Sequence, residues 1–330
     1  MRILTVIAVL VSASPTFGDQ PDIQAIVETH VIPRYQTLEI ETAELSKSAA
    51  ANCSTQNPDL ITAYHNAFDA WIRVSHLRFG PSEAEDRAFA LAFWPDPRGS
   101  TPKALSALIS AQDRAVSNAE DFAAVSVAAR GFYALEFLIF DPQFETKDNL
   151  DYKCELVQAV TKDIYRNSAD ILADWESSYG DLMAKADNDT YRSPTEAAQQ
   201  FFTSLSTGLE FTSQTRLGRP MGTFDRPRPK RAEARRSERS LRNVVLSLSA
   251  NRELAQLITA GNPEVDKAFQ TALGRAEALG DPIFAGVAEP QGRFKVEVLQ
   301  QSIDAIREIL AQDVGPSLGI AAGFNSLDGD

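Results

Sequence analysis

The helical spacing of apolar residues along most of the sequence is the feature that most constrains its fold. Between Asn57 and Gly80, for example, apolar side chains recur every three or four residues from Leu60 to Leu77, which is the period of one face of an α-helix. We find no stretch of strand length that alternates strictly between apolar and polar residues, the pattern of a half-buried strand. The sequence therefore predicts an all-α protein.

Proline and glycine divide this pattern into helices, because proline is tolerated in a first helical turn and glycine often follows a last one. The predicted helices fall into two groups separated between Asp141 and Asn149. We expect two packed helical bundles of the four-helix type, over residues 19–145 and 146–330. The predicted helices cover residues 22–45, 57–77, 101–109, 121–140, 149–179, 193–209, 231–257, 263–279 and 294–310.

The N-terminus has the pattern of an export signal. Arg2 is followed by an apolar run from Ile3 to Val11 and then by small residues up to Gly18. Such a run matches the central region of a signal peptide and is too short to cross a bilayer, which takes about 20 residues. Residues 1–18 are predicted to be a signal peptide, and the exported mature chain is expected to have no transmembrane span.

Composition excludes several classes of protein. The chain has 32 Lys and Arg against 45 Asp and Glu, a formal net charge of −13, whereas a nucleic-acid partner requires a cationic surface. Two Cys and three His in the chain are too few for zinc sites of the Cys₄ or Cys₂His₂ kind. In a reducing compartment Cys53 and Cys154 would be buried thiols, and in an oxidising one they would form a single disulfide. Export favours the disulfide.

The segment from Arg130 to Asp141 is the most informative for function. Its only charged residue between these two ends is Glu136, and a helix that is apolar on every face is buried. A carboxylate in a core costs several kcal/mol unless it is paired, protonated or bound to a metal. Tyr133 lies three residues earlier on the same helical face, and Gly131 suggests the close approach of another segment. The structural alternative is a Tyr133–Glu136 hydrogen bond or a Glu–Arg pair that joins the bundles.

A second feature is a basic segment in this acidic chain. It reads either as the solvated start of a helix or as a source of counter-charges for Glu136 or an anionic ligand, with Arg239 near the point where burial begins. Its eight cations are Arg226, Arg228, Lys230, Arg231, Arg235, Arg236, Arg239 and Arg242.

The histidines offer a weaker metal hypothesis. His65 and Asp69 are four residues apart and could hold a metal from one helical face. Two ligands are too few for a site, and a histidine on an apolar helix is more often structural. His30 shows no partner in the sequence.

These residues resemble the imelysin-like family of exported proteins. The stretch Gly131-Phe-Tyr133-Ala-Leu-Glu136 is similar to its GxHxxE signature. Four other stretches in the same order also resemble the family, namely residues 71–81, 93–96, 235–243 and 323–330.

The resemblance implies a two-domain, all-helical protein of the bacterial periplasm or outer-membrane surface, linked to iron-regulated uptake, with its site between the bundles. Gly131 and Glu136 match the signature, and Tyr133 stands where the family has His. Imidazole suits borderline divalent metals, whereas a phenol with a pKa near 10 must lose its proton and favours Fe³⁺. Glu136 and Tyr133 are therefore candidate iron ligands, and we expect Arg78 or Arg239 nearby in the ligand site.

Three functions remain open at this point. The preferred one is a periplasmic binding component of iron or heme-type uptake, whose partner is a metal ion, a small iron-containing ligand or an envelope uptake protein. The second is the metallopeptidase for which the family is named, which requires three convergent protein ligands and an open position. The third is a non-catalytic interaction protein with a degenerate site, in which Glu136 is fully paired with an arginine and has no cavity beside it.

Overall fold

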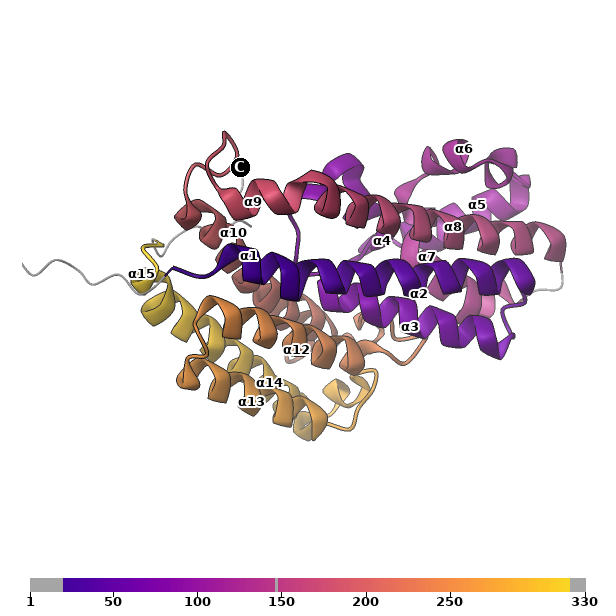
Figure 1. The fold of residues 1–330 in the computed structure, drawn as a ribbon. Coiled ribbons are helices and arrows are strands. Elements are labelled where there is room, and N and C mark those ends of the chain that lie inside the picture. Colours follow the sequence, from indigo (N-terminus) through magenta and orange to yellow (C-terminus); the bar gives the residue numbers. More distant parts are fainter. Residues whose placement is uncertain (1–19, 146–147, 321–330) are drawn as a thin grey trace, which may run out of the picture.

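The computed structural model describes residues 20–145 and 148–320, so the predicted signal peptide and residues 323–330 lie outside the described part. Within these ranges the regular structure is helical, apart from an isolated bridge between Thr223 and Arg226 (Figure 1). The prediction of an all-α fold is confirmed. The α-helices of the described ranges are α1 (Ile23–Ile26), α2 (Ile32–Ala51), α3 (Pro58–Val74), α4 (Arg87–Leu91), α5 (Ser100–Ala111), α6 (Ala119–Ala123), α7 (Gly131–Phe140), α8 (Leu150–Asp174), α9 (Gly180–Lys185), α10 (Pro194–Glu210), α11 (Gly218–Met221), α12 (Ser240–Ile258), α13 (Pro263–Glu277), α14 (Pro290–Ile309) and α15 (Gly315–Ser317).

Several of these helices are continuous through a π-helical turn. The turns at Val27–Val31, Trp175–Tyr179, Phe211–Leu217 and Leu310–Val314 join α1 to α2, α8 to α9, α10 to α11 and α14 to α15. Such turns are uncommon and frequently occur at functional sites. The prediction that the helix starting near residue 149 ends at Gly180 is wrong, because the π turn before this glycine carries the helix on to Lys185.

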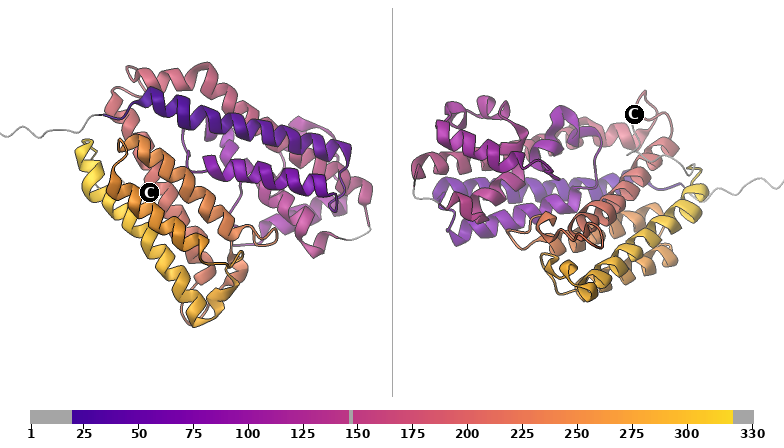
Figure 2. Two further views of the ribbon diagram at one scale, coloured as in Figure 1. Left: turned by 60° about the horizontal axis from the view of Figure 1, so that its bottom comes forward. Right: turned by 180° about the vertical axis from the view of Figure 1, so that it is seen from behind.

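The helices pack in two groups. In the first, α2 lies between α8 and α3, α7 packs on α8, and the shorter helices α4, α5 and α6 pack against α7 and α8 (Figure 1). In the second, α10, α12, α13 and α14 form a separate group at the C-terminal side (Figure 2). Two packed bundles are therefore present as predicted. Because α8 packs along α2, we propose that the division lies between α9 and α10, later than residue 145.

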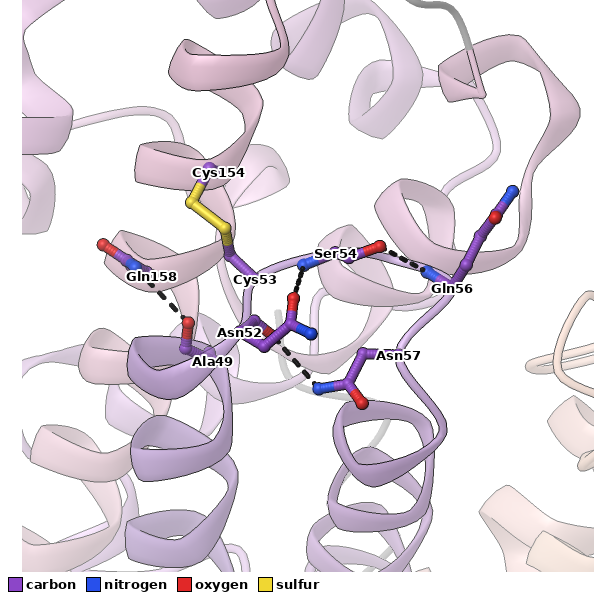
Figure 3. Close-up of a disulfide and its surroundings, with 8 residues drawn as sticks. All are labelled: Ala49, Asn52, Cys53, Ser54, Gln56, Asn57, Cys154 and Gln158. Atoms are coloured by element: carbon purple, nitrogen blue, oxygen red, sulfur yellow. Dashed lines mark hydrogen bonds between the residues drawn. A yellow bond between two sulfur atoms is a disulfide. The ribbon is translucent and has the colours of Figure 1, made fainter.

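A disulfide fastens the first group at one end. Cys53, in the connection from α2 to α3, is bonded to Cys154 in α8, with Cα atoms 5.2 Å apart (Figure 3). One turn further along α8, the Gln158 amide donates a hydrogen bond to the Ala49 carbonyl at 3.3 Å. The predicted disulfide thus joins the segment that follows the C-terminus of α2 to the N-terminal part of α8.

Gly131 determines where α7 begins. Its φ is +73°, and a Cβ atom there would lie 2.3 Å from the carbonyl oxygens of both Ala90 and Leu91. Only glycine fits this conformation and this close approach, so the approach predicted for Gly131 is confirmed. The single predicted helix over residues 121–140 is wrong, since α6 ends at Ala123 and α7 starts at Gly131.

Two buried histidines meet where the two groups join. His30, in the first π turn, and His76, just after α3, face each other with their Nε2 atoms 3.0 Å apart. The Ser204 hydroxyl of α10 donates to the His76 carbonyl oxygen at 2.6 Å, so the pair links both groups. Both Nδ1 atoms are buried without a hydrogen-bond partner in the described residues. His30 therefore has a partner that the sequence did not reveal.

Burial and nearby cations keep this pair neutral. Desolvation, the charge on His76 and that on Arg34 hold the pKa of His30 well below its usual value. Desolvation and the charges on Arg34 and Arg216 lower the pKa of His76 to about 3. Each ring is therefore uncharged at neutral pH.

Removal of the disulfide should lower the stability of the fold. We expect the Cys53→Ser/Cys154→Ser variant to lose roughly 4–5 kcal/mol of unfolding free energy, because the bond closes a loop of 101 residues in the unfolded chain. Urea denaturation of both proteins measures this difference. A loss below about 1 kcal/mol would show that the unfolded chain is not constrained by this bond.

The histidine pair should make the fold sensitive to acid. Between about pH 6.5 and pH 4 the unfolded chain protonates at His76 whereas the folded chain does not, so stability falls as pH decreases and is fully present above pH 6.5. One such histidine contributes up to about 1.4 kcal/mol per pH unit. Urea denaturation at several pH values should give a shallower slope for His76→Gln than for the unchanged chain, and identical slopes would contradict this assignment.

Candidate functional site

Glu136 is buried as the sequence predicted. Its side chain projects from α7 and the residue is 2% exposed. The Oε1 atom accepts hydrogen bonds from the Ser237 backbone N–H at 3.0 Å and from the Ser237 hydroxyl at 2.9 Å. Burial raises the pKa of Glu136, although the Ser237 donors and the nearby Arg236 charge act in the opposite direction. Two hydrogen bonds from Ser237 thus hold the Glu136 carboxylate, in place of an ion pair with an arginine of the described residues.

Tyr133 does not bond to Glu136, contrary to the structural alternative. Its hydroxyl donates to Glu233 Oε1 at 2.5 Å, and Arg216 Nε donates to Glu233 Oε2 at 2.8 Å. All three residues are buried. Burial, together with the Glu233 charge, raises the pKa of Tyr133 well above its usual value. The phenol is therefore a protonated donor in this arrangement.

Arg216 is itself fixed from several sides. It lies in the π turn Phe211–Leu217, and its Nη1 atom donates to Thr212 at 3.2 Å and to Ser247 at 3.1 Å. Its guanidinium carbon lies 4.9 Å from the ring centre of Phe211. The π turn thus directs a buried charge from the second group of helices toward α7.

The residues that bond to α7 come from one irregular segment, residues 232–239, which we call the 232–239 turn. It occupies the start of a helix predicted over residues 231–257, and that start is wrong because α12 begins at Ser240. Ala234 and Glu238 have φ of +45° and +56°, which no helix permits. The Ser240 hydroxyl donates to the Glu233 carbonyl oxygen at 2.5 Å. This turn directs both Glu233 and Ser237 toward α7.

Arg239 lies at the end of this turn and is 2% exposed. It donates to Asp69, and its Nη1 atom contacts His65 Nδ1 at 3.0 Å. Arg242 donates to the same carboxylate. His65 and Asp69 thus bind two arginines, which lower the pKa of Asp69 despite its burial, and the metal hypothesis for this pair is not supported.

Arg78 does not lie with these residues. Its guanidinium forms an ion pair with Glu83 at 2.5 Å, and both side chains are 43% exposed. From the basic segment, Arg236 instead approaches the site, where it pairs with Asp141 and lies 3.6 Å from the ring centre of Phe137. The segment therefore supplies a counter-charge near Glu136 through Arg236, whereas Arg239 pairs with Asp69.

Several buried polar atoms of α3, the 232–239 turn and α12 have no hydrogen-bond partner in the described residues. They are the Tyr64 hydroxyl, Arg239 Nε and both side-chain amide atoms of Asn243. Of these residues, Tyr64 is close enough to Glu136 for that charge to raise the pKa of its phenol, after burial itself. Because buried polar groups are nearly always paired, the Tyr64 hydroxyl near Glu136 requires a water or a ligand to complete its hydrogen bonds.

The donor set of the site determines which metals it suits. Within residues 20–145 and 148–320, no three His, Cys, Asp or Glu side chains converge as metal ligands. The site instead combines the carboxylates Glu136 and Glu233 with the phenols Tyr64 and Tyr133. Hard oxygen donors of this kind suit iron(III) better than zinc, and each phenol would have to lose its proton to coordinate.

Comparison with known proteins identifies the family. The sequence pattern of the imelysin family matches residues 31–310. The chain belongs to the imelysin family. It is 23% identical over 324 residues to iron-regulated protein A of Synechococcus elongatus, covering 89% of this chain and 85% of that protein.

Solved structures agree with the imelysin fold. An imelysin-like protein from Psychrobacter arcticum superposes with a TM-score of 0.72 at 20% identity, over 92% of this chain and 96% of the other. A protein from Parabacteroides distasonis, described as an iron-regulated protein A precursor, gives 0.68 at 14% identity, over 87% and 93% of the two chains. In the part of the chain that the structure describes, no helix is long and apolar enough to cross a membrane.

Sequence reasoning located α7 in this imelysin-family chain but missed its partners. These partners lie 80 to 104 residues after Tyr133 and Glu136 along the chain, and none belongs to a short motif. They are Arg216, Glu233 and Ser237. Arg216 left no signal in the sequence, since it lies between the helices predicted over residues 193–209 and 231–257. Glu233 left one, because it is one of two acids within the basic segment.

Glu136 should contribute far more to stability than an exposed glutamate. We expect Glu136→Ala to lower the unfolding free energy by about 2 kcal/mol or more, because it leaves the Ser237 donors buried without an acceptor. Glu308→Ala, on the exposed face of α14, should change it by less than about 0.5 kcal/mol. Urea denaturation compares the two, and small, equal effects would contradict a special environment for Glu136.

Proposed function

We propose that this imelysin-family protein is an exported, periplasmic binding component of iron acquisition. Its ligand, Fe³⁺ or a small iron-containing molecule, would bind where α7 meets the 232–239 turn. Family membership and the likeness to a protein named iron-regulated protein A support the iron role. The apolar run after Arg2 supports export, as does the disulfide, since such bonds persist in oxidising compartments.

The observation that carries this proposal is an unpaired phenol near a buried carboxylate. Glu136 is buried, and the hydroxyl of nearby Tyr64 has no hydrogen-bond partner in the described residues. A ligand at this place would complete the hydrogen bonds or coordination of the phenol and would neutralise the carboxylate. Both carboxylates and both phenols of the site offer oxygen atoms, which matches the hard Fe³⁺ ion.

Binding of Fe³⁺ would be coupled to loss of protons. Burial raises the pKa of Tyr64, Tyr133 and Glu136, so a metal must displace protons from any of them that coordinate it. Iron loading should therefore increase as pH rises. Glu233 is already bonded to Arg216, which favours Glu136 over Glu233 as the first carboxylate to respond to a ligand.

A non-catalytic interaction protein is the second candidate, and one observation favours it. Tyr133 and Glu136 both have hydrogen-bond partners within the chain, although Ser237 holds Glu136 in place of the arginine that this function predicts. The metallopeptidase is less well supported, because no third ligand of the zinc type converges with Glu136 in the described ranges.

Iron binding can be tested on the protein purified from the periplasm without a His tag. After incubation with Fe³⁺ and removal of free metal, elemental analysis should give one iron per chain and visible spectroscopy should show a phenolate-to-iron charge-transfer band. Tyr133→Phe should reduce the bound iron at least tenfold and abolish or shift the band.

Tyr165→Phe is the matched control, because this partly buried tyrosine of α8 is outside the site. It should keep both iron and spectrum. If the unchanged protein takes up no iron while Tyr133→Phe lowers only its stability, the iron proposal fails and the interaction protein is supported.

A further inference from the structure

A tight turn between α11 and α12 presents an aromatic side chain to solvent. Phe224 is 73% exposed, the largest value among the large apolar side chains of the described residues. It lies at the tip of a turn in which Thr223 and Arg226 form an isolated bridge. A single exposed apolar residue is ordinary, but this one is held in a fixed turn and lies in a cationic stretch of the chain.

The backbone of the turn is fixed at both ends. The Arg226 N–H donates to the Thr223 carbonyl oxygen at 3.0 Å, and the Arg228 N–H donates to the Pro220 carbonyl oxygen at 2.8 Å. Gly222 has φ of +55°, and a Cβ atom there would lie 2.5 Å from the Arg226 carbonyl oxygen. The turn is therefore a specific structure.

Arg293 of α14 donates hydrogen bonds to the backbone of this turn. Its Nη1 atom donates to the carbonyl oxygens of Met221 at 2.6 Å and Thr223 at 3.2 Å. Its guanidinium carbon lies 5.8 Å from the ring centre of Phe224. The aromatic ring is thus held above an arginine with most of its surface in solvent, an arrangement that buries little apolar area and contributes little to folding.

The same stretch of chain carries uncompensated positive charge. Residues 219–231 contain five cations against the single acid Asp225. In the ranges that the structure describes, the ion pairs of this region belong to Arg216, Arg236, Arg239 and Arg242, and the five take part in none. We call these five cations and Phe224 the Phe224 surface. The five are Arg219, Arg226, Arg228, Lys230 and Arg231.

Arg219 and Arg231 lie close enough for the charge of one to act on the other. Arg219 lies over the ring of Trp94 at 5.7 Å, and its Nε atom is buried without a partner. Desolvation and the charge of Arg231 both lower the pKa of Arg219. Like charges held together without a counter-ion favour binding of anions.

We propose that the Phe224 surface docks the protein on the surface of an anionic phospholipid membrane, with Phe224 inserted among the lipids and the surrounding cations against the headgroups. Peripheral membrane binding combines a buried apolar group with electrostatic attraction to anionic lipids. The Phe224 surface offers both on one pinned segment. The rest of the chain is acidic, with a net charge of −13 overall, so it is repelled by such a membrane and the protein would bind in one orientation.

Vesicle co-sedimentation of the mature full-length chain tests this proposal. We expect binding to vesicles of phosphatidylcholine mixed with phosphatidylglycerol, no binding to phosphatidylcholine alone, and loss of binding as salt increases. Phe224→Ser should weaken binding about tenfold or more. Arg226→Gln/Lys230→Gln should weaken it about 25-fold, since each cation near an anionic surface contributes about fivefold.

Matched controls separate this effect from general changes in charge or stability. Ile40→Ser removes another exposed apolar side chain, on α2, and Arg114→Gln removes an exposed cation in the first group of helices. Both should bind vesicles like the unchanged chain. All variants should retain the same helical circular dichroism and melting temperature, because the substituted side chains are exposed.

The proposal is overturned if the unchanged chain does not bind the anionic vesicles at low salt, or if the controls weaken binding as much as the test variants. Titration with inorganic pyrophosphate in a calorimeter covers a further outcome. If pyrophosphate binds with one site per chain and the vesicles do not bind, the cations recognise a small soluble anion and the membrane proposal is wrong. None of these readouts involves iron.

Discussion

The burial of the Glu136 carboxylate is the constraint on which the site depends. A buried charge must be satisfied by hydrogen bonds or counter-charges, and here two donors of Ser237 satisfy it. That requirement explains why the chain before α12 forms an irregular turn, since in a helix starting at residue 231 the Ser237 N–H would donate to the Glu233 carbonyl oxygen and could not donate to Glu136. Helix α12 consequently begins late, at Ser240.

Much of the fold could be predicted from the sequence because its helices are specified locally. Asn57 and Ser193 cap α3 and α10 with their side chains, as the Asn-Pro and Ser-Pro pairs indicate. Boundaries set by tertiary contacts could not be predicted. Helix α7 starts at Gly131 because the carbonyl oxygens of Ala90 and Leu91 lie against it, and local propensity contains no information about that contact.

The site could be predicted only in part, for the same reason. A lone acid in an apolar helix indicates burial without its partners being known, so Glu136 could be identified. The hydrogen bond from Tyr133 to Glu233 joins residues 100 apart, and no spacing rule connects them. Arg78 was expected near the ligand site because its stretch of sequence resembles the family. It instead forms a local ion pair with Glu83.

Acid opposes cation binding at the proposed site and also lowers the stability that depends on the histidine pair. Burial favours the protonated form of Glu136, Tyr64 and Tyr133, so protons compete with any cation that binds there. Burial favours the neutral form of His30 and His76, so acid lowers the stability of the fold by protonating these rings in the unfolded chain. A cation bound at the proposed site would therefore be opposed by acid in two independent ways, by direct competition for the oxygen ligands and by a lower stability of the fold that holds them.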